Sequence, residues 1–275
     1  MELSDDLRRM REDWDRRARE NARYYIATGR EEWSDEEFFA SGQAEVDEQI
    51  LNDMENICQE RDPKQMRVLE IGCGAGRVTR ALAGVFGEVH AVDVSGEMVA
   101  RARDALREVP NVAVYQNNGM DLSVVPELPF DFAFSMLVMQ HIPNRDVVQK
   151  YFEEAARLLK PGGLFKVQML GRPAAPVAPP APEAPPAELP LKWKLTGKIP
   201  LPIRQKVLRP IREMIAPLPT PPPPPPETPD TWIGVMYTPE DAAALADGAG
   251  FELRYQRGAG QEFYWLWCFK RPPQP

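Results

Sequence analysis

The stretch VLEIGCGAGRVTRAL, residues 68–82, decides how the whole chain is interpreted. An apolar run typical of a buried strand leads into three alternating glycines, Gly72, Gly74 and Gly76, and a helical pattern follows at once. A strand that continues through such a loop into a helix usually holds a nucleotide, because glycine lets the backbone approach the ligand closely. A phosphate-binding loop is excluded, since no Gly-Lys-Ser/Thr sequence follows.

The segments around this loop alternate between strand and helix patterns. From residue 66 onward the strand patterns are MRVLEIG, EVHAVDVS, NVAVYQNN, FDFAFSMLVMQHI and LFKVQML. Near the C-terminus, a capped helix pattern (TPEDAAALADGAG) precedes two strand patterns that the turn RGAG joins. Strands that alternate with helices at this spacing predict a parallel sheet with helices on both faces, here closed by a C-terminal hairpin.

Composition divides the chain into four segments. Residues 1–65 form an N-terminal helical cap, with an amphipathic helix over 1–26 and a second helix over 41–60 that Ser41 caps. Residues 66–171 form the nucleotide-binding core. Residues 172–230 hold 20 of the 30 prolines. Proline disrupts both helices and the hydrogen bonds between neighbouring strands, so we expect this segment to be an insertion. Residues 231–275 complete the sheet.

The insertion contains a basic amphipathic segment at residues 191–218, with seven basic residues and one acid. Ile203, Val207 and Ile211 fall on one helical face, and Trp193 precedes them. Four roles fit this pattern: a second lid, a contact between two copies in a dimer, a helix on a membrane surface, or a solvent-exposed segment that packs loosely on the domain. The sequence leaves these alternatives open.

Charge and composition exclude several classes of function. A net charge of −8 argues against a nucleic-acid partner, which requires a basic surface. Three scattered cysteines are too few for a disulfide framework or a zinc site, and no metal-ligand cluster is evident. No signal-peptide pattern and no apolar run of membrane-span length occurs, so we expect a cytoplasmic protein without a transmembrane segment.

Two acidic residues indicate which nucleotide the loop holds. Glu70 precedes Gly72 by two residues, and Asp93 ends the next strand pattern. An acid beside the loop would repel a pyrophosphate but suits a cationic ligand. The spacing Gly-x-Gly-x-Gly also differs from the Gly-x-Gly-x-x-Gly of dinucleotide sites. These features favour a positively charged nucleoside over NAD, and an NAD-dependent oxidoreductase is the disfavoured alternative.

Five segments resemble, in the same order, the motifs of class I S-adenosylmethionine-dependent methyltransferases. They are VLEIGCGAGRVT, VHAVDVSGEMV, NGMDL, FDFAFSMLVMQHIP and LLKPGGLFKV. The resemblance spans about residues 66–170. It implies an α/β fold, a Rossmann-like three-layer sandwich with a mostly parallel seven-stranded sheet and an antiparallel C-terminal hairpin strand. It also implies S-adenosyl-L-methionine as the cofactor.

The resemblance implies how the first two motifs bind the methionine and ribose parts of this cofactor. Gly72, Cys73 and Gly74 would let the backbone approach the methionine part. Glu70 would hold the charged end of that part through the loop. Asp93 would accept hydrogen bonds from both ribose hydroxyls.

The resemblance assigns the adenine to residues that follow the second and third strands. Val94 and Met98 would pack on the ring. Asp121 would accept a hydrogen bond from the adenine amino group, and the backbone N–H of Leu122 would contact a ring nitrogen. Met136, just past the fourth strand pattern, is a candidate for a backbone contact.

The acceptor side of the reaction is less determined. Methyl transfer from a sulfonium needs mainly positioning and desolvation, and a general base only if the acceptor is protonated. His90 lies in a strand pattern and is expected to be structural. His141, at the mouth of the fourth strand, is either a general base or a pocket residue that does not titrate. Gln140 beside it could orient an acceptor, and the absence of an Asn-Pro-Pro-Tyr motif argues against DNA as substrate.

Specificity is expected to come from outside the core, and the leading interpretation is a methyltransferase for a small-molecule acceptor. An aromatic cluster around Tyr24 and Tyr25 resembles the lid segments of similar enzymes, and both tyrosines are substrate-contact candidates. The rest of this cluster is Trp33, Phe38 and Phe39, and the weaker pocket candidates are Gln168, Trp232, Tyr237 and Tyr264. The alternative is a non-catalytic protein that binds S-adenosylmethionine or S-adenosylhomocysteine.

Overall fold

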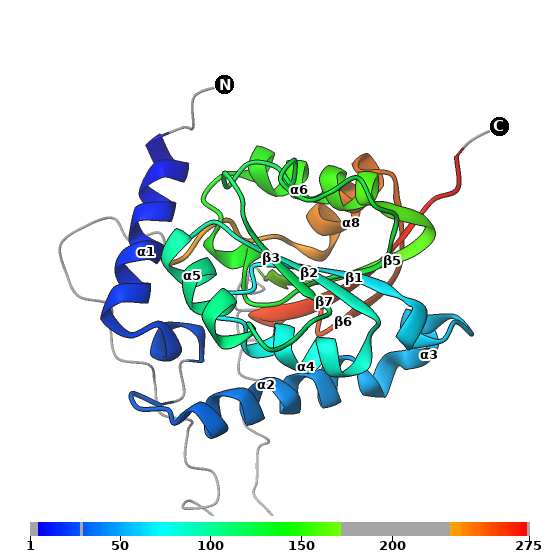
Figure 1. Ribbon diagram of the computed structural model, residues 1–275. Coiled ribbons are helices and arrows are strands. Elements are labelled where there is room, and N and C mark those ends of the chain that lie inside the picture. Colours follow the sequence, from blue (N-terminus) through cyan, green and yellow to red (C-terminus); the bar gives the residue numbers. More distant parts are fainter. Residues whose placement is uncertain (1–4, 28–29, 172–231, 274–275) are drawn as a thin grey trace, which may run out of the picture. The chain divides into compact units, whose positions relative to one another are not determined.

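The computed structural model describes residues 5–27, 30–171 and 232–273 (Figure 1). The expected insertion at 172–230, with its basic segment at 191–218, lies outside the described residues. The roles considered for that segment, and the division of the chain into four segments, therefore stay predictions.

Seven strands form one sheet in the order β3-β2-β1-β4-β5-β7-β6. Their bounds are β1 (Arg67–Ile71), β2 (Glu88–Asp93), β3 (Val112–Gln116), β4 (Phe130–Ser135), β5 (Leu159–Leu170), β6 (Phe251–Arg257) and β7 (Phe263–Lys270). β1 to β5 pair in parallel, whereas β7 runs antiparallel to both of its neighbours, β5 and β6. The predicted sheet with its C-terminal hairpin is confirmed.

Helices cover both faces of this sheet, which gives the three predicted layers (Figure 1). The helices and 3₁₀ turns are α1 (Asp5–Ile26), α2 (Asp35–Gln49), η1 (Leu51–Asp53), α3 (Met54–Cys58), η2 (Pro63–Gln65), α4 (Arg77–Val85), α5 (Gly96–Ala105), η3 (Met139–His141), α6 (Arg145–Leu158) and α8 (Pro239–Gly248). α6 and α8 lie on one face, and α2, α3 and α4 lie on the other. Along β1, Leu69 and Ile71 join one hydrophobic cluster while Val68 joins the other, as the two-residue period of a strand requires.

The N-terminal helices differ in part from the prediction. α1 agrees with the expected first helix, although Asn21 interrupts it with a non-helical backbone (φ −164°, ψ 83°). The prediction of a second helix over 41–60 capped by Ser41 is wrong. α2 begins earlier, because Ser34 and Glu37 form a capping box. Ser41 lies inside the helix, and its hydroxyl donates a hydrogen bond to the Phe38 carbonyl.

A charge buried under the sheet holds the end of the α2 segment in place. Lys166 on β5 is only 2% exposed, and its Nζ lies 2.8 Å from Asp53 Oδ2 in η1. Trp267 Nε1 donates to the same Asp53 oxygen at 2.6 Å, and its ring centroid lies 4.5 Å from the ammonium. The Asp53 carboxylate therefore accepts hydrogen bonds from the ammonium of Lys166 on β5 and the indole N–H of Trp267 on the neighbouring β7.

None of the helices within the described ranges combines the length and the apolar character needed to cross a lipid bilayer.

The Asp53–Lys166 pair generates a stability prediction. Replacing Asp53 by Ala leaves a buried ammonium without its counter-charge, so we expect the free energy of unfolding in urea to fall by about 3–5 kcal/mol. The double variant Asp53→Ala/Lys166→Met should regain most of this loss. Asp104→Ala, which removes an exposed pair with Arg107, is the control and should change stability by less than about 1 kcal/mol. Equal losses in Asp53→Ala and Asp104→Ala would show that the buried Asp53–Lys166 pair contributes no more to stability than an exposed pair.

Candidate functional site

A cavity opens at the carboxyl ends of the parallel strands, which is where ligands bind in sheets of this kind. We call it the central cavity. The glycine loop after β1, the end of β2, the segments after β3 and β4, and helices α1 and α6 all contribute to its wall. Its volume is about 80 Å³ in this conformation, because Met10 and Trp14 of α1 lie over the strand ends.

The glycine loop needs its glycines for two physical reasons. Gly72, Gly74 and Gly76 have φ values of +80°, +53° and +84°, a conformation that residues with a side chain rarely adopt. A Cβ at Gly72 would also lie 2.1 Å from a methyl group of Val138. The loop is anchored to the next strand, since the N–H groups of Gly72 and Cys73 both donate to the Val92 carbonyl.

Asp93 ends β2 and lines the central cavity, as predicted. Its carboxylate accepts hydrogen bonds from the Gly74 N–H at 2.8 Å and the Ser95 N–H at 2.9 Å. Burial raises the pKa of this carboxyl to about 6, and the nearby Asp15 of α1 acts in the same direction. The cavity thus has a fixed hydrogen-bond acceptor that titrates close to neutral pH.

Glu70 lies below the glycine loop rather than in the cavity wall. It is 4% exposed and accepts a hydrogen bond from Thr79 Oγ1 at 2.6 Å. Burial raises the pKa of Glu70 to about 7, although the hydrogen bond from Thr79 and the charge of Arg77 oppose the change. A cation bound above the loop would favour the ionised form of this carboxyl.

Two residues assigned to the cofactor by resemblance lie elsewhere. Cys73 is buried within the loop, and burial raises the pKa of its thiol, which suits packing rather than reaction. Met98 does not reach the central cavity. It packs instead against Ala18 and Ala22 of α1, because its position on the first turn of α5 faces that helix. Val94 does line the cavity.

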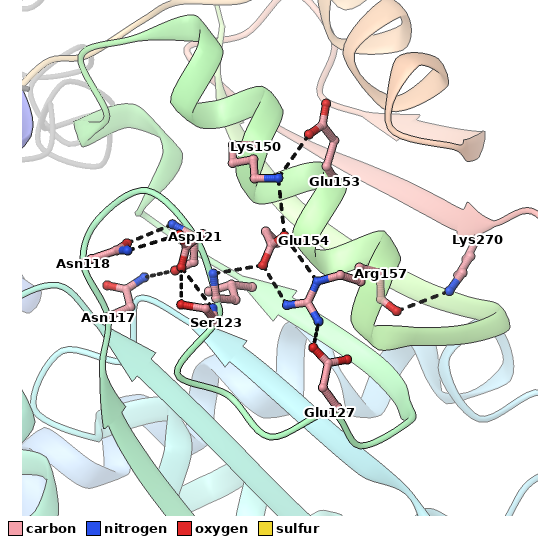
Figure 2. Close-up of polar contacts among 11 residues, drawn as sticks. Asn117, Asn118, Asp121, Ser123, Glu127, Lys150, Glu153, Glu154, Arg157 and Lys270 are labelled. Carbon is pink, nitrogen blue, oxygen red and sulfur yellow. Dashed lines mark hydrogen bonds and ion pairs between the residues drawn. The ribbon is translucent and has the colours of Figure 1, made fainter. Parts of the chain in front are cut away.

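The structure places Asp121 and Leu122, both assigned to the adenine by resemblance, in a loop whose polar groups bond to each other and to α6 (Figure 2). The Asp121 carboxylate accepts hydrogen bonds from the hydroxyl and N–H of Ser123 and from Asn118 Nδ2. These bonds stabilise the loop that contains Asp121. The N–H of Leu122 donates to Glu154 Oε2 on α6 at 3.2 Å. Neither residue lines the central cavity, and both groups have partners inside the protein.

Asn117 and Tyr151 also line the central cavity, and neither was predicted from the sequence. Asn117 follows β3 and donates through Nδ2 to the Tyr151 hydroxyl at 2.8 Å. Its Oδ1 is buried and has no hydrogen-bond partner within the described part of the chain. In the sequence, the Asn-Asn pair that ends the third strand pattern indicated a polar group at this edge of the sheet. The resemblance assigned the adenine contact to Asp121 instead.

The segment after β4 reaches the cavity through Leu137 and Val138 rather than Met136. Met136 packs on the opposite face, with the α2 and α4 cluster. Leu137 has a left-handed backbone (φ +59°), and its N–H donates to Gln168 Oε1 at 3.1 Å. Gln168, a weaker pocket candidate, therefore holds this segment and does not line the cavity.

His141 is a wall of the central cavity. Its Nδ1 lies 2.5 Å from the Trp232 carbonyl oxygen, which can only accept, so the imidazole proton is on Nδ1. The ring packs edge-on against Trp14 at 4.9 Å between centroids. Burial lowers the pKa of His141 to about 4, so the side chain is neutral at pH 7. His90 is structural, as expected, and contacts Glu88 and Tyr115.

A second cavity, which we call the outer cavity, lies on the other side of η3 and has a volume of about 240 Å³. Gln140 lines it, and the neighbouring His141 lines the central cavity. Apolar side chains form much of its wall, among them Trp232, Met236 and Phe263. Gln140 Oε1 is buried and has no hydrogen-bond partner among residues 5–27, 30–171 and 232–273.

The remaining pocket candidates line neither of these two cavities. Tyr264 is buried and donates to the Tyr237 and Thr238 carbonyls. Tyr25 donates to Glu20 and contacts the Trp232 ring, and Tyr24 packs on Tyr25. The structure thus covers the central cavity with Met10 and Trp14 of α1 and does not bring Tyr24 or Tyr25 to it.

The carboxylate of Asp15 links α1 to the start of α5. Asp15 Oδ1 accepts from the Ser95 hydroxyl at 2.6 Å and from the Glu97 N–H at 3.2 Å, at the start of α5. A carboxylate in this place interacts favourably with the N-terminal end of a helix. No group of His, Cys, Asp and Glu side chains within the described ranges could hold a metal ion.

Comparisons with known proteins agree with this architecture. A family model described as a methyltransferase domain matches residues 68–163. The ubiquinone biosynthesis O-methyltransferase of Xanthomonas axonopodis pv. citri is 31% identical over 124 residues, which are 44% of this chain and 51% of that protein. The demethylmenaquinone methyltransferase of Tropheryma whipplei is 33% identical over 133 residues, 48% of this chain and 54% of that protein. The chain spans about half the length of these curated relatives.

Solved structures extend the likeness to most of the fold. The magnesium protoporphyrin IX methyltransferase of Synechocystis PCC 6803, with bound S-adenosylmethionine, matches with a TM-score of 0.57. The match covers 98% of this chain and 99% of that chain at 13% sequence identity, so it concerns the fold alone. Taken with the glycine loop, the acid that ends β2 and the strand order, the family-model match identifies residues 68–163 as a methyltransferase domain with the architecture of the class I S-adenosylmethionine-dependent methyltransferases.

Proposed function

We propose that the chain transfers a methyl group from S-adenosylmethionine to a small-molecule acceptor. The observation that carries this proposal is the position of Asp93. Its carboxylate lines the central cavity beside the glycine loop and can accept hydrogen bonds from two neighbouring hydroxyls, as a ribose offers. The match of residues 68–163 to a methyltransferase domain supports the same conclusion.

The residues present fit this cofactor in their chemistry. The bare backbone at Gly72 and Gly74 admits the methionine part, and Glu70 places a titratable acid beneath the same loop. Val94 offers an apolar surface to the base. Sites for ligands of this size usually measure roughly 300–1,000 Å³. The central cavity is smaller, at about 80 Å³, so we infer that α1 shifts to admit the cofactor.

When bound, the cofactor supplies an activated methyl group on a sulfonium. The protein positions the two reactants and excludes water from the site. Trp14 and Met10 exclude water from above the cavity. His141 takes no proton near neutral pH, since its pKa is about 4, and it acts as a wall that orients neighbouring groups. The chemistry therefore suits acceptors that do not need His141 as a base.

The outer cavity is the proposed acceptor site. Its apolar wall accommodates an apolar ring or chain, and Gln140 Oε1 accepts a hydrogen bond from a donor group on it. The curated relatives include enzymes named for ubiquinone and demethylmenaquinone, whose names indicate small-molecule substrates. A non-catalytic cofactor-binding protein would use the same central cavity, so turnover is the property that separates the two functions.

Turnover tests the proposal. Purified chain is incubated with methyl-labelled S-adenosylmethionine and a panel of apolar hydroxylated aromatic compounds, and label is counted in the organic extract. We expect transfer to at least one compound in the wild type and a strong reduction in Gln140→Leu. Cofactor binding without transfer to any compound of the panel would favour the non-catalytic alternative.

The ribose assignment predicts the effect of removing Asp93. Charge-assisted hydrogen bonds contribute about 1.5–3 kcal/mol, so Asp93→Ala should weaken S-adenosylhomocysteine binding roughly ten- to a hundredfold in calorimetry. Asp104→Ala on the exposed end of α5 is the matched control. Unchanged affinity in Asp93→Ala would show that the ribose assignment is wrong.

Cofactor affinity should also depend on pH. The pKa of Asp93 is about 6 without ligand, and only the ionised carboxylate accepts from both hydroxyls. We therefore expect the affinity for S-adenosylhomocysteine to be constant above about pH 7 and to fall as the pH drops below 6. Calorimetry between pH 5 and pH 8 measures this. Glu70→Gln should keep the decline below pH 6, whereas Asp93→Asn should lose it.

Glu70 should lower the stability of the ligand-free chain at neutral and higher pH. The folded chain keeps a proton on Glu70 up to about pH 7, which the unfolded chain releases near pH 4.5, so stability falls across this window. Glu70→Gln should raise the free energy of unfolding at pH 8 by about 2–3 kcal/mol and change little at pH 4. Urea denaturation at both pH values tests this, with exposed Glu108→Gln as control. An equal effect at both pH values would contradict it.

A further inference from the structure

Two side chains in the central cavity carry hydrogen-bonding groups that the fold does not use. Asn117 follows β3 and is 6% exposed, and Tyr151 projects from α6 and is 4% exposed. They contact each other through Asn117 Nδ2 and the Tyr151 hydroxyl, 2.8 Å apart. Both residues line the cavity that Asp93 also lines.

The orientation of the Asn117 amide follows from its neighbours. The Asp121 carbonyl oxygen, which can only accept, lies 3.4 Å from Asn117 Nδ2. The amide nitrogen therefore faces Asp121 and Tyr151, and Oδ1 faces away from them. This Oδ1 is buried and lacks a hydrogen-bond partner within the described part of the chain. A buried acceptor without a donor is unfavourable, and a ligand in the same cavity can supply the donor.

The Tyr151 hydroxyl complements this acceptor. Its oxygen accepts from Asn117, so its own proton remains available for a second group. Burial raises the pKa of Tyr151, which keeps that proton in place at neutral pH. The pair thus offers one acceptor and one donor next to each other.

The position of this pair relative to Asp93 is fixed. The Asn117 N–H donates to the Asp93 carbonyl at 3.0 Å, so the two residues are neighbours across β2 and β3. The loop from Asn117 to Ser123 is fastened to α6, the helix of Tyr151, through the Leu122 N–H and Glu154 (Figure 2). Arg157 in turn holds Glu154 at 2.7 Å. Hydrogen bonds therefore connect the elements that carry Asn117, Tyr151 and Asp93.

We propose that Asn117 and Tyr151 together recognise one edge of the cofactor's base and select adenine. This inference rests on the proposed function, with the ribose at Asp93. Adenine presents a 6-amino donor beside the N1 acceptor, which matches Asn117 Oδ1 beside the Tyr151 O–H. Hypoxanthine presents the reverse, a 6-oxo acceptor beside an N1–H donor. Its 6-oxo oxygen would face the acceptor Asn117 Oδ1, and its N1–H would face the Tyr151 O–H, so neither hydrogen bond would form.

The test compares S-adenosylhomocysteine with S-inosylhomocysteine, which differ only in that edge of the base. Calorimetry on the full wild-type chain should show at least tenfold tighter binding of S-adenosylhomocysteine. Tyr151→Phe and, separately, Asn117→Ala should weaken S-adenosylhomocysteine about five- to twentyfold and leave S-inosylhomocysteine nearly unchanged. Tyr115→Phe, whose hydroxyl contacts His90 and does not line the cavity, is the matched control and should keep the full preference.

Two different failures are distinguishable in this experiment. Equal binding of the two ligands by the wild type, or equal weakening of both in Tyr151→Phe and Asn117→Ala, would overturn the inference and leave the proposed function standing. Absence of any S-adenosylhomocysteine binding by the wild type would overturn the proposed function and the inference together. Retained S-inosylhomocysteine binding shows that each variant is folded.

Discussion

The hydrogen bonds around Asp93 are the constraint on which the rest of the site depends. One carboxylate oxygen accepts from Gly74 in the loop after β1, and the other accepts from Ser95 at the start of α5. The backbone carbonyl of the same residue accepts from Asn117 after β3. A single residue thus joins the ends of three adjacent strands. The glycines of this loop are required because Gly72, Gly74 and Gly76 have positive φ values, which residues with a side chain rarely adopt.

This arrangement opposes the stability of the ligand-free protein. Asp93 and Glu70 are carboxyls whose pKa values burial raises, to about 6 and about 7, and Asp15 of α1 adds a further negative charge nearby. Most natural folds avoid such clusters of acids, because each ionised group disfavours the next. The proposed cofactor explains the exception, since its hydroxyls satisfy Asp93 and its positive charge favours ionised Glu70. Strain at Leu137, in the segment facing the same cavity, fits a site built for binding.

The sequence predicted those features that local pattern determines. The parallel strands, the C-terminal hairpin, the glycine loop, the position of Asp93 at the end of β2 and the cap of α8 all follow from short segments whose pattern is visible locally. The start of α2 was also visible, as the Ser34–Glu37 capping box, although the prediction placed it at Ser41. Asn117 and Tyr151 could not be paired from the sequence, because they are 34 positions apart and meet only when α6 packs on the sheet. The partner of the Leu122 N–H could not be predicted either, because Glu154 lies 32 positions away on α6.

We propose that the cavity at the end of β2 binds a cationic adenine nucleoside. Calorimetric titration of the full chain with S-adenosylmethionine, S-adenosylhomocysteine and NAD⁺ tests it most directly. We expect micromolar binding of the first two ligands and none of NAD⁺, since Glu70 beneath the loop repels a pyrophosphate. Binding of NAD⁺ with no binding of S-adenosylmethionine would contradict the assigned cofactor and the roles given to Glu70 and Asp93.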